Sequence, residues 1–471
     1  MPPPNDAQSF SVKRAQVEFH NFASLGEPER AIASYLDENV RRSAVIDAHR
    51  EFIGGMSPFL EIGANAGHTS YMLANQYKSD GFALDLSADA LHHGIALMDR
   101  CGFKRAPVRV AGDAVNLPFR DNSLQFVMAC QMLSQFMNIE SVFLEVKRVL
   151  APGGVFLFTE EPLRRRASFH VYRAPYVERM KPWERKLFDW GLLGYIARDV
   201  IGAEQEESFG IRQNHKMYLA DWHRLITRHF ADHRYQVFPP QRGWGEQIVK
   251  TVLRSEWNTA HLLGGTLAAM CKKTGTPGPV RGVDRFEDFL RCPDCHRDLV
   301  REPDDALVCA CGYRAPLEGG VYNLLPAALR AELYPGDRAD VIDFSLPTHT
   351  AHLREGWYDL EGDYGNKYRW IGARATAVLR PVRDGAQRLR LRGYAHASQF
   401  AAGQPVIEIR ANGAPVARQT LERVGLFILE ADLPQAGEYE IEIGASPTWA
   451  DPQDDRVFTV NLSMIRLVTP D

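Results

Sequence analysis

Short apolar runs alternate with amphipathic, helix-like stretches through the first third of the chain. The apolar runs lie at 58–62, 81–86, 108–110, 124–129 and 154–159. This alternation is typical of a parallel sheet whose strands are connected by crossover helices. It predicts an α/β domain, to which we assign residues 1–275.

The alternation stops between about residues 160 and 210, where the sequence becomes rich in arginine and aromatic residues and has a helical pattern. Strand-like patterns return at 233–238 and 267–272. We therefore predict that about 160–210 is a helical insertion into the first domain.

The remainder of the chain divides into shorter parts. A stretch dense in glycine and proline at 273–282 predicts a linker. A compact module over 286–326 and a connecting segment over 327–369 follow. Residues 370–471 alternate apolar and polar positions, and Asn412 with Gly413 forms a hairpin-turn signal between two such runs. This pattern predicts a C-terminal all-β sandwich.

The composition agrees with a folded protein of several domains. At roughly 150 residues per domain, 471 residues suggest about three domains. Hydrophobic residues make up 45% of the chain, charged residues 24%, and the net charge is −4. That balance, without a long run of one sign, argues against a broad electrostatic surface for nucleic acid. No apolar stretch is long enough for a membrane span, and the polar N-terminus lacks a secretory pattern, so we expect a cytoplasmic protein.

A ligand-binding turn is indicated where the first apolar run ends. The strand Phe59–Ile62 leads directly into the small residues 63–67, and a helical stretch begins at Thr69. Small residues let a backbone approach a ligand closely. The second strand ends about 20 residues later at Asp85, where a carboxylate can accept hydrogen bonds from both ribose hydroxyls.

Further landmarks follow in the same order as in one known family. The third strand leads to Asp113 and Ala114, the fourth ends near Cys130, and "APGG" at 151–154 precedes the fifth. Over roughly 59–159 the chain resembles the class I S-adenosylmethionine-dependent methyltransferases, which implies a Rossmann-like fold. A dinucleotide dehydrogenase is the alternative, but the G-x-G-x-x-G spacing is missing.

The resemblance also implies a set of cofactor-binding residues. The turn would lie under the methionine part, Asp85 would bind the ribose, Leu86 would flank the adenine, and Asp113 with Ala114 would contact its amino group. Asn65 stands where the family often has a second glycine. The implied residues are Glu61, Gly63, Ala64, Asn65, Gly67, Asp85, Leu86, Asp113, Ala114 and Cys130.

Methyl transfer from a sulfonium is an in-line displacement that depends mainly on alignment, but an alcohol acceptor also needs a group that takes its proton. Glu160 and Glu161 follow the fifth strand, His215 follows the insertion, and His68 begins the helix after the turn. Each also has a structural interpretation: a solvated or helix-start carboxylate, a surface histidine, or a turn cap. The fourth strand lacks the Asn/Asp-Pro-Pro-aromatic signature of enzymes that methylate amino groups of bases or glutamine.

Four cysteines lie close together in the sequence. Cys292 and Cys295 are followed, after thirteen residues, by Cys309 and Cys311. Four thiolates suit tetrahedral zinc with no open position, which is a structural site. The module resembles the zinc-ribbon family that includes the activator subunit of tRNA and release-factor methyltransferases, except that its second pair is C-x-C instead of C-x-x-C. The resemblance implies a structural or docking role.

The C-terminal region resembles β-sandwich modules attached to bacterial enzymes and glycosyltransferases that act on surface polysaccharides. Trp370, Tyr394 and Trp449 could stack on sugars, or they could be core residues. A self-association interface, and hence a homo-oligomer, is a further interpretation of this region.

The sequence thus predicts an S-adenosylmethionine-dependent methyltransferase with a structural zinc site. We expect the acceptor to be a hydroxyl on a sugar, a sugar nucleotide or a bacterial surface glycan, because of the attached modules. The alternatives are another small metabolite or natural product as acceptor, an RNA or translation-factor methyltransferase, and a cofactor-binding scaffold without catalysis. No nucleic-acid partner is expected.

Overall fold

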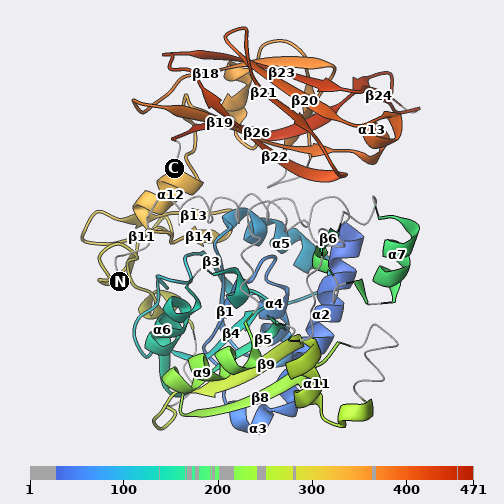
Figure 1. Cartoon of the computed structure of the whole chain (residues 1–471). Helices are drawn as coiled ribbons and strands as arrows, with labels where there is room; N and C mark the ends of the chain where they lie inside the picture. Colours follow the sequence, from blue (N-terminus) through green and yellow to red (C-terminus); the bar gives the residue numbers. More distant parts are fainter. Residues whose placement is uncertain are drawn as a thin grey trace. The chain divides into compact units, whose positions relative to one another are not determined.

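The computed structural model describes residues 28–136, 138–164, 166, 172–174, 180–190, 192–193, 197–200, 217–240, 251–278, 283–362, 367–452 and 454–469 (Figure 1). Contacts along the chain divide the described part into one unit that ends at residue 327 and a second unit that begins at residue 328. Among the described residues, no helix combines the length and the apolar character needed to cross a bilayer.

A nine-stranded sheet is the framework of the first unit. Its order is β13-β14-β3-β2-β1-β4-β5-β9-β8. The five strands from β3 to β5 run parallel, whereas β9 and β8 are antiparallel to their neighbours. The strands are β1 (Phe59–Ile62), β2 (Gly81–Asp85), β3 (Val108–Ala111), β4 (Leu124–Cys130), β5 (Leu150–Leu163), β8 (Asp232–Phe238), β9 (Gly265–Lys272), β13 (Leu317–Glu318) and β14 (Val321–Asn323). This confirms the predicted Rossmann-like α/β class.

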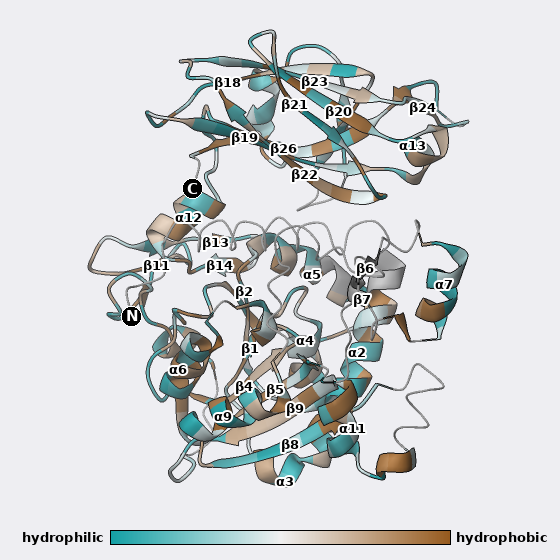
Figure 2. Cartoon of the chain, in the orientation of Figure 1, coloured by the Kyte–Doolittle hydropathy of each residue, from teal (hydrophilic) through white to brown (hydrophobic). Residues whose placement is uncertain are grey.

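Helices connect and cover these strands. They are α2 (Pro28–Ala48), α3 (Arg50–Ile53), α4 (His68–Gln76), α5 (Ala88–Arg100), α6 (Ile139–Val149), α9 (Leu219–His229) and α11 (Glu256–Leu263). In α6 the buried positions Val142, Phe143, Val146 and Val149 recur at helical spacing, and Phe143 packs edge-on against Phe156 of β5. Every residue of β4 is buried, as expected for a strand covered on both faces. Figure 2 shows that β8, at the edge, is more hydrophilic than β9 beside it.

The prediction of a helical insertion from residue 160 is wrong at its start. Residues 160–163 belong to β5, because Glu161 and Leu163 pair with Leu267 and Gly265 of β9. The described part of the insertion contains one helix, α7 (Pro182–Asp189), and two strands, β6 (Tyr172–Ala174) and β7 (Ala197–Val200), which pair in parallel. The other positions of the insertion lie outside the described residues.

The cysteine-containing module is continuous with the main sheet, although the sequence predicts a separate module. Its three short strands, β10 (Val300–Arg301), β11 (Leu307–Val308) and β12 (Arg314–Ala315), form an antiparallel sheet of their own. Farther along the chain, β14 pairs in parallel with β3, and Phe289 packs 6.0 Å from Phe82 of β2, measured between ring centroids. Strands of two or three residues carry no periodic signal, so the sequence pattern did not indicate this pairing.

Two larger antiparallel sheets and the two-stranded antiparallel sheet of β24 and β25 form most of the described part of the second unit and confirm the all-β prediction. One has the order β16-β17-β26-β19-β22 with β15 beside β26, and the other has the order β18-β23-β20-β21. The elements are β15 (Val341–Asp343), β16 (Trp357–Glu361), β17 (Tyr368–Ile371), β18 (Arg374–Leu379), β19 (Gln387–Ala395), α13 (Ala397–Ala402), β20 (Val406–Ala411), β21 (Ala414–Thr420), β22 (Gly425–Leu433), β23 (Tyr439–Ser446), β24 (Trp449–Ala450), β25 (Val457–Phe458) and β26 (Val460–Val468).

The segment 327–369, predicted as a connection, contributes to these sheets. After α12 (Ala327–Leu333), β15 pairs with β26 and β16 pairs with β17. The sheet therefore begins about thirty residues before 370, because β26 offers an edge that a short segment can pair with.

Candidate functional site

The turn between β1 and α4 has an unusual backbone. Gly63, Asn65 and Gly67 have φ angles of 71°, 49° and 80°, in the left-handed region. Ala64 N–H donates to the carbonyl of Leu84 in β2 over 3.0 Å. The turn thus lies at the carboxyl ends of the parallel strands, where open α/β sheets bind ligands.

We predict that Gly63→Ala destabilises the protein more than Gly102→Ala does. Both glycines have positive φ, which costs about 1–2 kcal/mol for an L-residue. A Cβ atom at Gly63 would also lie 3.1 Å from Cβ of Met132, whereas a Cβ at Gly102 meets nothing within 4 Å. Urea unfolding of both variants measures the difference, and equal losses of stability would contradict the steric contact.

Asp85 is a buried carboxylate beside this turn. It is only 2% exposed and ends β2. Its Oδ2 accepts a hydrogen bond of 2.8 Å from Asn65 N–H, and its Oδ1 accepts one of 2.8 Å from Ser87 N–H. Its carbonyl accepts from Gly112 N–H, so Asp85 connects the turns that follow β1, β2 and β3. Leu86 beside it is half-buried.

Asp113 and Ala114 follow β3, and both are buried. Oδ1 of Asp113 accepts from Val115 N–H over 3.1 Å. In the same turn, the side-chain amide of Asn116 donates to the carbonyl of Pro293 over 2.9 Å. Pro293 lies between Cys292 and Cys295, so the segment that carries the first cysteine pair contacts this turn.

Glu61 lies in β1, and Cys130 ends the neighbouring strand β4. Glu61 is buried in β1, and its Oε2 accepts from the backbone N–H of Ser70 over 2.7 Å and from the Ser70 hydroxyl over 2.5 Å. These bonds attach the start of α4 to the strand. Burial raises the pKa of Glu61, and burial raises the pKa of the Cys130 thiol well above its usual value.

His68 and Glu160 meet on the same arginine, Arg42 of α2. Nη1 of Arg42 lies 2.6 Å from Nε2 of His68 and donates to Thr69 Oγ1 over 2.7 Å, while Nη2 donates to Glu160 Oε2 over 2.8 Å. Glu38 Oε2 lies 3.0 Å from Nη2 of Arg42 and 2.9 Å from Nε2 of His68. We call these five residues the Arg42 cluster.

The sequence analysis did not identify Arg42 or Glu38. Both lie on a helix that precedes the first strand, and the pairing of Arg42 with Glu160 joins residues 118 positions apart. A charged residue on an amphipathic helix is usually solvated, so no local pattern distinguishes Arg42 from its neighbour Arg41.

Glu161 is fully buried, and its carboxylate is occupied by backbone groups. Its Oε1 accepts from the N–H groups of Met132 and Leu133 over 2.9 and 2.8 Å, and its Oε2 accepts from Ser134 N–H over 3.0 Å. Glu161 therefore holds the segment after β4 in place. Burial raises the pKa of Glu161 to about 7, although these N–H donors act in the opposite direction.

This pKa predicts pH-dependent stability. The pKa of Glu161 in the folded state lies above its unfolded value of 4.5. The contribution of Glu161 to the free energy of unfolding is therefore complete below about pH 4.5 and is lost as the pH rises through about 7. The loss amounts to up to about 3 kcal/mol. Urea unfolding between pH 4.5 and 8 measures it, and Glu161→Gln, which cannot titrate, should flatten the dependence. An equally steep dependence in Glu161→Gln would contradict the assignment.

His215, the remaining predicted acid–base residue, lies outside the described residues.

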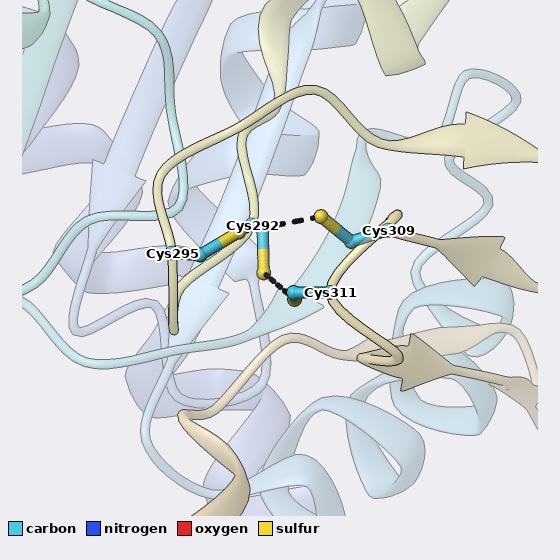
Figure 3. Close-up of side chains that lie close together, drawn as sticks. All are labelled: Cys292, Cys295, Cys309 and Cys311. Carbon is cyan, nitrogen blue, oxygen red and sulfur yellow. Dashed lines mark hydrogen bonds between the residues drawn. The ribbon is translucent and has the colours of Figure 1, made fainter.

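The four cysteines come together from two turns, as Figure 3 shows. Sγ of Cys292 lies 3.7 Å from Sγ of Cys311, Sγ of Cys295 lies 3.4 Å from Sγ of Cys309, and all four atoms lie within 4.8 Å of one another. The first turn is closed by His296 N–H donating to the Cys292 carbonyl, the second by Gly312 N–H donating to the Cys309 carbonyl. The C-x-C spacing of the second pair therefore still brings both thiols to the cluster.

The aromatic residues considered for sugar stacking differ in their surroundings. The Trp449 ring lies 5.0 Å from His396 and 4.9 Å from Phe458, measured between ring centroids, with interplanar angles of 23° and 32°. Trp370 packs edge-on against Trp449. Trp449 thus packs against aromatic rings of its own unit.

Part of the chain is similar to known proteins. A family model described as "Methyltransferase domain" matches residues 60–158. Norajmaline N-methyltransferase of Rauvolfia serpentina is 26% identical over 165 residues, which are 35% of this chain and 53% of that protein. Malonyl-[acyl-carrier protein] O-methyltransferase of Geobacter sulfurreducens is 31% identical over 111 residues, 23% of this chain and 40% of that protein.

A third relative is fatty-acid O-methyltransferase of Mycolicibacterium smegmatis, 30% identical over 136 residues, 28% of this chain and 42% of that protein. Among solved structures, phosphoethanolamine N-methyltransferase 2 of Haemonchus contortus in complex with S-adenosyl-L-methionine has a TM-score of 0.31 and 17% identity, covering 56% of this chain and 57% of that one. The chain spans about half the length, or less, of these curated relatives. Residues 60–158 are thus similar to a methyltransferase domain, and the three relatives are methyltransferases.

Proposed function

We propose that this protein transfers a methyl group from S-adenosylmethionine to a small-molecule acceptor. One observation carries the proposal: the buried carboxylate of Asp85 is held by Asn65 N–H against the positive-φ turn. A carboxylate in this place can accept hydrogen bonds from the ribose hydroxyls. The small residues of the turn also let the protein backbone approach a ligand closely.

The residues of the site fit an adenosyl ligand. The turn 63–67 would support the cofactor, Asp85 would bind the ribose, and Leu86 would pack beside the adenine. Asp113 and Ala114 would contact the adenine edge, since their turn is bonded to Asp85 through Gly112 N–H. Glu61 and Cys130 would line the buried side of the cofactor site, because both side chains are buried.

The bound cofactor would supply an electrophilic methyl group on a positively charged sulfur. The chain would then mainly align the acceptor with it and exclude water. Glu161 would act as a positioning residue, because its carboxylate is already bonded to three backbone N–H groups. The carboxylate of Glu160 is already paired with Arg42, so His68 and His215 remain the candidates for the base.

The chemical class of the methyl acceptor is a second, more specific proposal. The related enzymes are named for an alkaloid, a malonyl group on acyl-carrier protein and a fatty acid, and this favours a small metabolite over RNA. The sugar or glycan acceptor rests on the resemblance of the C-terminal unit alone, and Trp449 packs against His396 and Phe458 of that unit.

We further propose that the four cysteines hold a structural zinc ion. A tetrahedral Zn–S₄ centre with bonds of about 2.3 Å has sulfur–sulfur distances of about 3.8 Å. The Sγ distances of 3.4 and 3.7 Å are close to that value. Four thiolates leave no open position, so the ion would support the fold and not the reaction.

Incubation with methyl-labelled S-adenosylmethionine tests the function. We expect label to enter one of several acceptor pools, offered separately: fatty acids and quinones, other small metabolites, sugar nucleotides, polysaccharide, and RNA. Calorimetric binding of S-adenosylhomocysteine without transfer to any pool would favour a cofactor-binding scaffold. Absence of binding would contradict the proposal.

A further inference from the structure

Two arginines gather on one aromatic ring just beyond the end of β5. Cζ of Arg164 lies 4.9 Å and Cζ of Arg166 lies 5.8 Å from the centre of the Tyr218 ring. Both arginines are exposed, whereas Tyr218 is half-buried. We call these three residues the Tyr218 site. It concentrates two positive charges at one place on the surface of the first unit.

Backbone hydrogen bonds hold both arginines in place. Arg164 N–H donates to the Met217 carbonyl over 2.9 Å, and Arg166 N–H donates to the Leu262 carbonyl of α11 over 3.0 Å. Met217 also forms a parallel bridge with Leu163, the last residue of β5. Side chains that start from a fixed backbone lose less freedom when they bind a ligand, so this arrangement favours binding.

The charges of the Tyr218 site are not balanced by an acid. Within the described part of the chain, neither guanidinium pairs with a carboxylate, and a cation–π contact at an exposed position is a weak interaction. Asp221, in the first turn of α9, pairs with Arg224 over 3.4 Å. Because α9 begins at Leu219, the positive end of its helix dipole also lies beside Tyr218. A bound anion would balance these charges.

A series of contacts connects this site to the candidate cofactor turn. Met132 lies against the turn, since a Cβ atom at Gly63 would be 3.1 Å from Cβ of Met132. Met132 N–H donates to Glu161 of β5 over 2.9 Å. Arg164 follows Glu161 by three residues, or roughly 10 Å of strand. Because β1, β4 and β5 are parallel, the site lies at the same edge of the sheet as the turn, at a distance that one small molecule can span.

We propose that Arg164, Arg166 and Tyr218 bind an anionic group of the methyl acceptor, a carboxylate or a phosphate. This inference rests on the proposed function, and it narrows the acceptor to acidic small molecules. Each guanidinium can donate two parallel hydrogen bonds to such an oxyanion. The anion fixes one end of the acceptor, so that another part of it can be aligned with the methyl group.

Anion binding is measured first, on the full-length protein saturated with S-adenosylhomocysteine. Inorganic phosphate and acetate are titrated separately by calorimetry at constant ionic strength, which distinguishes the two kinds of anion. We expect the double variant Arg164→Gln with Arg166→Gln to bind the preferred anion at least about 10-fold more weakly than the wild type, because it loses charge-assisted hydrogen bonds. Its affinity for S-adenosylhomocysteine should equal that of the wild type.

The matched control is the double variant Arg224→Gln with Arg228→Gln. It removes two exposed arginines from α9 and changes the net charge by the same amount. This control should bind the anion as tightly as the wild type does. Equal anion affinities in the two double variants, or no binding of either anion to the wild type, would overturn the inference.

The role of the site in acceptor binding is tested with labelled S-adenosylmethionine. We expect label in small molecules that anion exchange retains, and in Arg164→Gln with Arg166→Gln the KM for that acceptor should rise at least about 10-fold while the KM for S-adenosylmethionine stays the same. Label only in neutral acceptors or in RNA also contradicts the inference. If the wild type does not bind S-adenosylhomocysteine, the proposed function fails, whereas the anion titration without it still tests the Tyr218 site.

Discussion

Asp85→Ala should weaken the binding of S-adenosylhomocysteine by roughly 10- to 100-fold. The substitution removes charge-assisted hydrogen bonds to the ribose, which are worth about 1.5–3 kcal/mol. It also removes the acceptors of Asn65 N–H and Ser87 N–H, so the turn loses part of its support. Isothermal titration calorimetry measures the affinity.

Asp85→Asn separates these two contributions. It keeps the volume and one oxygen acceptor but loses the negative charge. Asp80→Asn is the control, because Asp80 lies just before the same strand and pairs at the surface with Arg105. The affinity of Asp80→Asn for S-adenosylhomocysteine should match that of the wild type. An unchanged affinity in Asp85→Ala would exclude Asp85 as the ribose ligand.

Replacing Cys292 and Cys295 together with serine should release zinc and lower the melting temperature by roughly 6–12 °C. Structural zinc contributes about 10–16 kcal/mol to the folding of small zinc peptides. In a unit of this size, a loss of about 3 kcal/mol of stability lowers the melting temperature by roughly 6–12 °C. The loss should reach the main sheet, because β14 pairs with β3 and Phe289 packs against Phe82 of β2. Metal analysis and thermal melting measure the two effects.

Cys101→Ser is the control for this experiment. Cys101 is a half-buried cysteine near the end of α5 and belongs to a different part of the unit. Its substitution should leave both the zinc content and the melting temperature nearly unchanged. A wild-type protein that contains no zinc would rule out the metal site. An unchanged melting temperature in the double variant would show that the cysteine module and the sheet unfold independently.

Local patterns predicted the architecture of the first unit up to the fifth strand. The strands β1 to β5 are apolar runs bounded by turns, and their positions can be read without knowing which strands are neighbours. The same holds for the candidate cofactor turn, because an apolar strand, small residues and a helix occur consecutively in the sequence. The spacing from this turn to Asp85 also follows from the chain, since one crossover helix has a nearly constant length.

The cysteine cluster was predictable for a related reason. Two close pairs separated by a short segment can meet in only a few ways, and four thiolates specify their own geometry. The attachment of this module to β3 was not predictable, because β13 and β14 contain only two and three residues. Strand pairing of that kind depends on which sheet edge is free in the folded protein.

The contacts of the candidate acid–base residues could not be predicted from the sequence either. Glu160 and Glu161 are adjacent in sequence, yet one pairs with Arg42 and the other accepts from the backbone of residues 132–134. A bulge between Phe158 and Glu161 separates their environments. The sequence by itself determined the positions of strands β1 to β5 along the chain, the turn after β1 and the grouping of the four cysteines, because these depend on neighbours along the chain. Only the tertiary structure decided the partners of buried charges, because contacts between residues more than a hundred positions apart leave no local pattern.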